Sequence, residues 1–368
     1  THEHERFKDA NGDLTDTAIK VNQNMAVMQP MMMLVMNVTS IAIVWFGGIR
    51  IAQSSMEIGD MMAFIQYAMQ IMLSFVMVAV MFVMIPRAQA SAERINEVLE
   101  MEPEIVDPEE AKLLTDGERG HIVFENVSFR YPGAEEPAIS NISFETDPGE
   151  VTAIIGGTGS GKSTLINMIP RFYDVSEGRI LVDGAGVSEL SQSELRRKIG
   201  FVPQSAVLFT GSISDNIRYG NKEATDEEVY HAAEVAQVTS FISETPEGFD
   251  TAIAQGGTNV SGGQKQRLSI ARALVRKPEI YIFDDSFSAL DFKTDALLRA
   301  ALKKETGDSA VIIVAQRVST VIDADQILVL DDGKLVGIGN HRELMKNCQV
   351  YQEIVSSQLS EEEMNAYE

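Results

Sequence analysis

Two long apolar stretches stand out in the N-terminal part of the chain. Residues 21–49 and 61–86 contain no charged side chain, whereas charged residues are frequent on either side of them. A helix needs about 20 apolar residues to cross the hydrocarbon core of a bilayer, and residues 26–49 and 61–85 each reach that length. Two buried core helices are the alternative, but soluble helices normally keep a polar face. The pattern therefore predicts two membrane-spanning helices.

Lysine and arginine near the ends of these stretches predict their orientation. Basic residues flank the pair on its outer sides, while the loop between the stretches has one basic and two acidic residues. Because basic residues favour the cytoplasmic side, we expect both ends of the chain in the cytoplasm and residues 53–59 outside. The expected location is the cell membrane, with a multi-pass topology and contact with lipid. The flanking basic residues are Arg6, Lys8, Lys20, Arg87 and Arg94.

After the second stretch the pattern becomes that of a water-soluble protein. Residues 88–100 predict a helix that continues from the second span, so residues 1–100 are expected to form the membrane domain. Prolines and an acidic cluster mark residues 101–120 as a linker. Apolar runs then alternate with helical patterns over residues 121–357, which predicts an α/β domain with a mainly parallel central sheet. Residues 358–368 are an acidic tail.

The expected elements of the α/β domain follow from its periodicity. Short apolar runs predict strands at residues 122–124, 142–144, 151–155, 281–283 and 310–314. Helical spacing of apolar positions predicts helices at residues 162–169, 226–236, 263–275 and 295–304.

Composition narrows the class of protein. The 368 residues include 54 acidic and 30 basic ones, a formal net charge of −24, which disfavours a nucleic-acid partner because such binding needs a basic surface. The single cysteine, Cys348, excludes an intrachain disulfide. Most of the 18 methionines fall between Met25 and Met84, where deformable thioethers suit either lipid-facing packing or an adaptable substrate wall.

The expected strand at residues 151–155 runs directly into a glycine-rich segment, GGTGSGKST. Glycines let the backbone turn its N–H groups toward phosphate oxygens, and a helix start adds partial positive charge. In this pattern Lys162 reaches the β- and γ-phosphates of a nucleotide and Ser163 binds Mg²⁺. The predicted nucleotide-binding residues are Gly156, Gly157, Thr158, Gly159, Ser160, Gly161, Lys162, Ser163 and Thr164.

Two further motifs follow this loop. The segment EIYIFDD, residues 279–285, is an apolar strand that ends in two carboxylates, and Asp284 is the predicted second magnesium ligand. The segment VSGGQKQR, residues 260–267, opens a helix with small residues. That helix start is either a second anion site or an ordinary helix cap.

In this order, GGTGSGKST, VSGGQKQR and IYIFDD resemble the ATPase domain of ABC transporters, over about residues 120–357. The membrane segment in the same chain narrows the resemblance to exporters. The resemblance implies a P-loop ABC-type ATPase fold preceded by an all-α transmembrane segment, with ATP and Mg²⁺ as ligands. Exporters of this type have six membrane helices per subunit, so we expect a fragment without the first four.

The resemblance also assigns roles to single residues. Tyr131 in FRYPG matches the aromatic residue that stacks on adenine, although it also fits an ordinary strand residue. Gln204 matches the glutamine that contacts Mg²⁺, and Asp291 matches a loop that crosses the dimer interface. In this family two ATPase domains pair head to tail, and the signature of each completes the ATP site of the other. The matching signature residues here are Ser261, Gly262, Gly263 and Gln264.

Two site positions depart from the family. Asp285 stands where the family usually has glutamate as catalytic base, and a shift of about 1 Å can cost about 100-fold in rate. Gln316 stands where the family usually has histidine, and glutamine does not titrate near neutral pH. Gln255 and Gly256 also differ from the usual glutamate and arginine. With Lys162 as the third predicted catalytic residue, we expect a site that binds ATP but hydrolyses it weakly.

These features predict one half of a heterodimeric exporter, an ATP-driven translocase for amphipathic, drug-like or lipid-like molecules. Its partner would be a second half-transporter with the competent glutamate and histidine, whose site this chain's signature completes. A homodimeric exporter with slow hydrolysis and an ATP-binding regulator without transport are the alternatives. The membrane spans argue against the regulator, and ATP-dependent uptake into inverted vesicles separates it from an exporter.

Overall fold

The computed structural model describes residues 2–112 and 119–358. The chain divides into two compact units, Thr1–Glu102 and Pro103–Glu368. Part of the expected linker, residues 113–118, lies outside the described residues, as does the expected acidic tail after Gln358.

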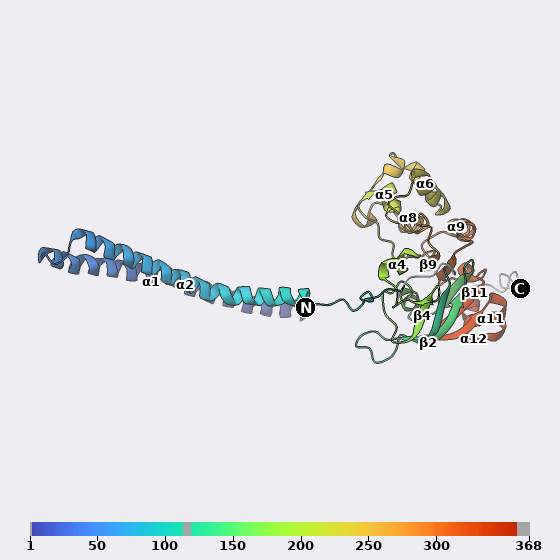
Figure 1. The fold of residues 1–368 in the computed structure, drawn as a ribbon, viewed down its shortest axis with the longest axis horizontal. Helices are drawn as coiled ribbons and strands as arrows, with labels where there is room; N and C mark the ends of the chain where they lie inside the picture. The colour runs from blue at the N-terminus through green and yellow to red at the C-terminus, as the bar shows by residue number, and fades with distance from the viewer. Residues whose placement is uncertain (1, 113–118, 359–368) are drawn as a thin grey trace. The chain divides into compact units, whose positions relative to one another are not determined.

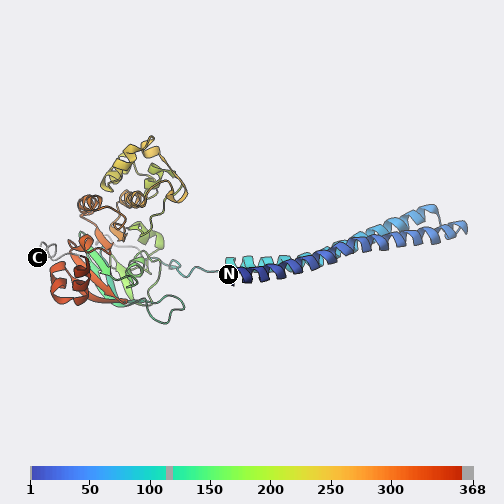
Figure 2. The ribbon, with the colours of Figure 1, turned by 180° about the vertical axis from the view of Figure 1, so that it is seen from behind.

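The first unit is a hairpin of two long helices that lie side by side, α1 (His2–Ala52) and α2 (Ile58–Leu99) (Figure 1, Figure 2). A Cβ on Gly47 would lie 3.0 Å from the Met61 side chain, so this glycine lets the helices approach closely. Both expected spans fall within these helices, and α2 continues to Leu99 as the sequence predicted.

Among the described residues, two helices are long and apolar enough to cross a membrane, and these are α1 and α2. Their large apolar side chains are exposed, with Trp45 at 69% and Phe82 at 75%. Apolar surface of this extent is rare on monomeric soluble proteins and typically contacts lipid or other protein surfaces.

The second unit contains the central sheet that the sequence predicted, with strand order β12-β11-β3-β10-β9-β6. Strands β11, β3, β10, β9 and β6 run parallel, and β12 pairs antiparallel with β11 at the edge. The bounds are β3 (Val151–Gly156), β6 (Ile199–Val202), β9 (Ile280–Asp284), β10 (Ala310–Val314), β11 (Gln326–Asp331) and β12 (Lys334–Gly339).

A separate antiparallel sheet, in the order β2-β1-β4-β5, packs against the central sheet. Phe124 and Phe144 stack at 4.4 Å on this sheet, and their apolar cluster includes Ile154 and Ile282 of the central sheet together with Leu165. Helix α3 (Lys162–Asn167) supplies Leu165 and is therefore held by both sheets. The strands are β1 (Ile122–Phe129), β2 (Ile139–Thr146), β4 (Glu177–Val182) and β5 (Ala185–Gly186).

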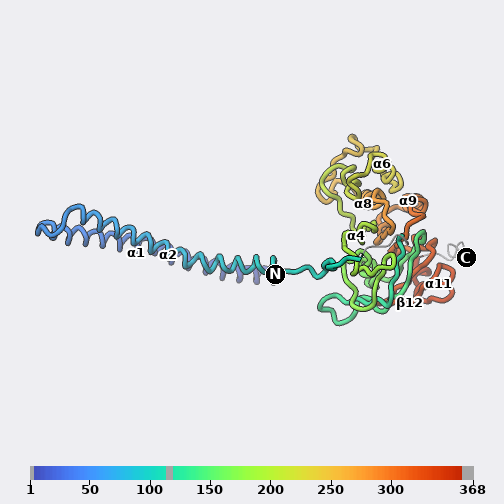
Figure 3. The backbone as a smooth tube through the Cα atoms, in the orientation of Figure 1, coloured from blue at the N-terminus to red at the C-terminus, as the bar shows by residue number. Residues whose placement is uncertain are grey.

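The remaining helices form two groups. Helices α5, α6 and α8 pack on one another in one lobe, with α8 also in contact with β6, whereas α11 and α12 lie beside the central sheet near β11 and β12 (Figure 1, Figure 3). The short strands β7 (Gly211–Ser212) and β8 (Ala252–Ile253) pair with each other. The helices are α4 (Gln192–Arg197), α5 (Ile213–Arg218), α6 (Asp226–Val235), α7 (Thr239–Glu244), α8 (Gly262–Leu274), α9 (Phe292–Glu305), α10 (Val318–Val321), α11 (His341–Asn347) and α12 (Gln349–Gln358), with 3-10 turns at Gly248–Asp250 and Gln255–Gly257.

The parallel strand order places four predicted site segments at one edge of the central sheet. The glycine-rich loop follows β3, Asp285 follows β9, Gln316 lies just after β10, and Gln204 lies just after β6. Because β3, β10, β9 and β6 are neighbours in that order, their carboxyl ends meet. Open α/β sheets commonly bind ligands at this edge.

Candidate nucleotide site

A cleft of about 370 Å³ lies at this edge of the sheet. It brings together residues that are far apart in the sequence. They come from the glycine-rich loop, from Asp284 and Asp285 at the end of β9, and from the predicted glutamines Gln204 and Gln316. Gly156, Gly157 and Ser160 belong to the same loop without being among the lining residues. The lining residues are Tyr131, Ala138, Thr158, Gly159, Gly161, Lys162, Ser163, Thr164, Gln204, Asp284, Asp285, Val314 and Gln316.

Glycine is required at two positions of the loop. Gly161 precedes α3 with φ 95°, and a Cβ there would lie 2.6 Å from the Ile139 side chain. A Cβ on Gly156 would lie 2.1 Å from the carbonyl oxygen of Leu330. Real Cβ atoms do not approach other atoms this closely, so the loop can pack against its neighbours only with glycine at these positions.

Lys162 is the first residue of α3, and its ammonium lies within the loop. Its Nζ donates to the carbonyl oxygens of Gly156 at 2.9 Å and Gly157 at 2.6 Å. Burial lowers the pKa of Lys162, while the nearby carboxylates of Asp285 and Asp284 act in the opposite direction. The loop therefore holds a desolvated cation next to a cradle for phosphate oxygens.

Asp284 and Ser163 provide two oxygen ligands of the kind that Mg²⁺ prefers. Ser163 Oγ donates to Asp284 Oδ1 at 3.1 Å, and burial raises the pKa of Asp284. In residues 2–112 and 119–358, no cluster of three His, Cys, Asp or Glu side chains is placed to hold a metal ion. The pair fits Mg²⁺ in its usual nucleotide complex, where phosphate oxygens and water supply the other ligands.

Asp285 is held by two amides. Its Oδ2 accepts hydrogen bonds from Gln316 Nε2 at 2.8 Å and from Gln204 Nε2 at 3.3 Å. Its backbone is left-handed, with φ 46°, and its N–H donates to the Val314 carbonyl oxygen at 2.9 Å. Burial raises the pKa of Asp285, whereas the hydrogen bonds from Gln204 and Ser288 oppose that rise. The carboxylate is thus fixed, and two donors already engage the same oxygen.

Tyr131 lines the cleft with its ring partly exposed. Its hydroxyl lies 3.0 Å from Thr164 Oγ1, and its ring contacts Phe129 and Tyr173 edge-on at 4.8 and 5.5 Å between centroids. The side chain is 37% exposed. A partly exposed aromatic ring at the cleft suits stacking on a planar base.

The predicted signature residues and Asp291 are not among the residues that line the cleft. Ser261 caps α8, where its Oγ accepts from the Gln264 N–H at 3.3 Å and its own N–H donates to Gln264 Oε1 at 2.8 Å. Asp291 caps α9 by accepting from the Thr294 N–H at 3.0 Å. Both helix caps form within this chain. Ser261 is thus a helix cap, as one of the two predictions for this helix start stated, and this role does not exclude binding of an anion by the same segment.

Sequence reasoning missed several residues of the site. Ala138 and Val314 line the cleft, and Gln266 Nε2 donates to the Pro203 carbonyl oxygen at 3.0 Å. The Gln266 bond connects the signature helix to the segment that carries Gln204. Gln266 lies within the segment VSGGQKQR, but a contact across 63 positions leaves no local pattern in the sequence.

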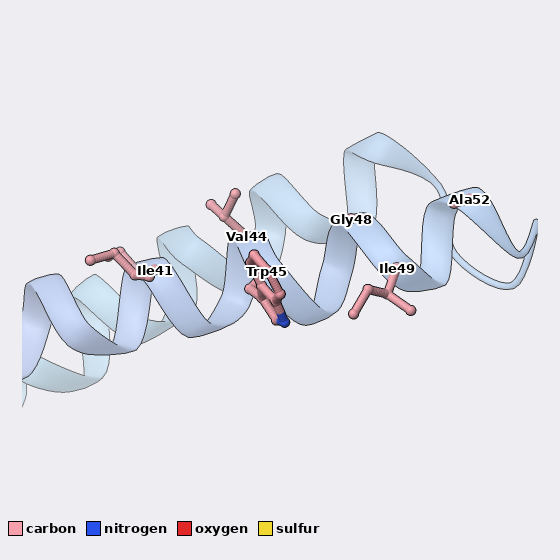
Figure 4. Close-up of a pocket in the computed structure, with 7 residues that line it drawn as sticks. Ile41, Val44, Trp45, Gly48, Ile49 and Ala52 are labelled. Carbon is pink, nitrogen blue, oxygen red and sulfur yellow. The ribbon is translucent and has the colours of Figure 1, made fainter.

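A separate apolar groove lies on α1 near the hairpin loop, as Figure 4 shows. Its lining residues recur at spacings of one and three or four, which places them along one face of the helix. Small residues at Ser40, Gly48 and Ala52 make room beside the Trp45 ring. The groove is apolar and suits a hydrocarbon chain or another helix.

Two family models match the chain. The model described as ABC transporter matches residues 139–288, and the model described as ABC transporter transmembrane region matches residues 1–83. The two matches fall in different compact units.

Several curated proteins are similar along most of the chain. An ABC transporter ATP-binding protein of Mycobacterium tuberculosis is 43% identical over 360 residues, covering 97% of this chain and 62% of that protein. The fatty acid ABC transporter ATP-binding/permease protein of the same species is 37% identical over 349 residues, covering 94% and 54%. The ATP-dependent lipid A-core flippase of Chromobacterium violaceum is 36% identical over 320 residues, covering 87% and 54%.

A solved structure of a bacterial Atm1-family ABC exporter with ATP bound has a TM-score of 0.86 and 32% sequence identity, covering 98% of this chain and 63% of that chain. The chain therefore spans less than two thirds of the length of the relatives named here. A transmembrane region and an ATPase domain follow one another in this single chain as the two family models describe them. The protein belongs to the ABC transporter family.

Proposed function

We propose that this chain is one half of an ATP-driven exporter in the cell membrane, with its ATPase domain in the cytoplasm, and that its own ATP site binds ATP but hydrolyses it slowly. The observation that carries this proposal is the arrangement at Asp285. One oxygen of its carboxylate accepts hydrogen bonds from both Gln316 and Gln204. A general base must accept a proton within hydrogen-bond reach. With Oδ2 engaged by two donors, this role falls to Oδ1, on a side chain one methylene shorter than the glutamate usual in the family.

The cleft supports MgATP binding, because its residues offer contacts for the phosphates, the metal ion and the base. The loop that ends at Gly161 would cradle the phosphates, Lys162 would place a cation beside them, and the partly exposed ring of Tyr131 would stack on the base. Ser163 and Asp284 would hold Mg²⁺, which would neutralise phosphate charge. These residues would bind and orient ATP even where its cleavage is slow.

The signature supports a role in a second subunit's site. Ser261 and Gln264 form a closed capping box at the start of α8, away from the cleft of their own domain. We propose that this start faces the ATP of a partner half-transporter with the usual glutamate and histidine. A homodimer with slow hydrolysis is the alternative, and it would place two weak sites in one assembly.

We propose amphipathic or lipid-like molecules as the exported substrates. Relatives named as a fatty acid transporter and a lipid A-core flippase support this substrate class. The groove beside Trp45 and the methionine-rich faces of α1 and α2 offer adaptable apolar contacts of the kind such molecules need.

Replacing Lys162 with Ala should weaken MgATP binding by about 10- to 100-fold, because each hydrogen bond to a charged group contributes about 1.5–3 kcal/mol. Titration of the full chain with a fluorescent ATP analogue would measure the change. The matched control is Lys222→Ala, since Lys222 is an exposed lysine of the same domain. An unchanged dissociation constant for Lys162→Ala would remove this cleft as the ATP site.

A further inference from the structure

The last described residue of α12, Gln358, bridges two points on the loop between β10 and α10. Its Nε2 donates to the carbonyl oxygen of Gln316 at 2.8 Å. Its Oε1 accepts from the N–H of Val318 at 2.9 Å. One side-chain amide thus uses both its donor and its acceptor on the backbone on either side of Arg317.

The Val318 bond replaces a helix cap that the local sequence does not provide. Helix α10 begins at Val318, and within the described part of the chain the Arg317 side chain makes no cap hydrogen bond to it. The first N–H groups of a helix have no partner inside the helix. Gln358 satisfies one of them from a helix 40 positions away in the sequence.

The Gln316 bond acts on the segment that holds Asp285. Gln316 Nε2 donates to Asp285 Oδ2 at 2.8 Å, so the backbone position of Gln316 decides where its amide lies. On the other side of the loop, Arg317 donates to the Ser288 carbonyl oxygen at 3.2 Å and lies over the Phe292 ring at 5.6 Å. Arg317 therefore ties the loop to the segment after β9, and Gln358 ties the same loop to α12.

Helix α12 is a firm support for such a bridge. Its Tyr351 and Val355 side chains are 0% and 1% exposed and belong to the domain core. Gln352 Nε2 also ties the helix to the Met345 carbonyl oxygen of α11 at 2.7 Å. The position of Gln358 is therefore set by core packing and not by the loop it contacts.

We propose that Gln358 is a positioning residue of the ATP site, which couples the end of α12 to the Gln316–Asp285 hydrogen bond. The functional part of this proposal rests on the proposed ATP site, whereas the bridge itself does not. A displacement of the end of α12 would release the Gln316 carbonyl oxygen and the Val318 N–H together, and with them the amide that holds Asp285.

The bridge is tested by hydrogen–deuterium exchange on the full chain without nucleotide. In Gln358→Ala, exchange at the Val318 amide should become about tenfold faster, because the Val318 N–H loses its acceptor and the loop loses its second bond to α12. Gln358→Glu keeps an acceptor for the Val318 N–H but loses the donor to Gln316. In this variant the Val318 amide should exchange faster than in the native chain and more slowly than in Gln358→Ala. Gln349→Ala, which removes an exposed glutamine of the same helix whose amide donates to Glu353 of α12, should leave Val318 exchange unchanged.

The effect on the site is read from steady-state kinetics in the Asp285→Glu, Gln316→His background. Adding Gln358→Ala should lower kcat several-fold with little change in the KM for ATP, and Gln349→Ala should change neither. Unchanged Val318 exchange in Gln358→Ala, or the same acceleration in Gln349→Ala, would overturn the proposal. If that background has no activity, the proposed ATP site fails, and the exchange result still decides whether the bridge exists.

Discussion

Replacing Asp285 with Glu and Gln316 with His together should raise ATP turnover at this chain's own site by about 100-fold, the cost expected for a base misplaced by about 1 Å. The longer side chain carries the carboxylate further into the cleft. The second change removes the amide that donates to Asp285 Oδ2 at 2.8 Å. Steady-state phosphate release from the full chain, with saturating MgATP, measures the gain.

The two changes act on one hydrogen-bonded unit, so their effects should not add. Each single variant should recover only part of the gain. The double variant should also acquire a pH dependence near pH 6–7 that the native chain lacks, because histidine titrates there and glutamine does not. ATP affinity is the control and should stay the same, since Lys162 and Ser163 are untouched. A native chain that already turns over as fast as the double variant would contradict this prediction.

Replacing Gly262 with Asp should abolish hydrolysis by the assembled transporter, with a loss of about a thousandfold, as expected when stabilisation of a charged transition state is removed. Among the described residues, no atom lies within 4 Å of the position that a Cβ on Gly262 would take, so the domain itself should tolerate the substitution. The new carboxylate would repel the phosphates of the partner's ATP. ATPase assays on this chain together with its partner half would measure the loss.

Ser240→Asp is the matched control, because it adds the same charge at an exposed position of α7 in the same domain. It should leave hydrolysis unchanged. If the assembled pair with Gly262→Asp keeps its activity, the signature of this chain does not complete the partner's site. If Gly262→Asp instead removes the turnover of this chain assayed alone, two copies of the chain share their sites and the homodimer alternative is supported.

Much of this fold could be predicted from the sequence because its central strands are buried on both faces. Strands β9 and β10 are buried along their whole length, so each gives a continuous apolar run. The edge strand β12 alternates exposed and partly buried positions and contains glycines, which hides it from a search for apolar runs. In the antiparallel sheet the predicted strands at residues 122–124 and 142–144 fall within β1 and β2, whereas β4 was not predicted, since its first three residues are exposed.

The candidate site shows the same division between local and long-range information. The glycine-rich loop and Asp284 could be predicted because each lies in a contiguous motif after a buried strand. The shared hold on Asp285 could not, because Gln204 lies 81 positions away and its contact depends on strand order. The Gln358 bridge, which spans 42 positions from Gln316, leaves no trace in either local sequence.

The fate of ATP bound to this chain tests the central claim most directly. The purified full chain is loaded with an equal amount of radiolabelled ATP and Mg²⁺, quenched at intervals, and the ratio of ATP to ADP on the protein is measured. We predict that the nucleotide stays ATP for minutes, a rate at least about a thousandfold below the typical enzyme turnover of about 10 s⁻¹. Conversion of the bound ATP to ADP within a second would contradict a weakly hydrolysing site.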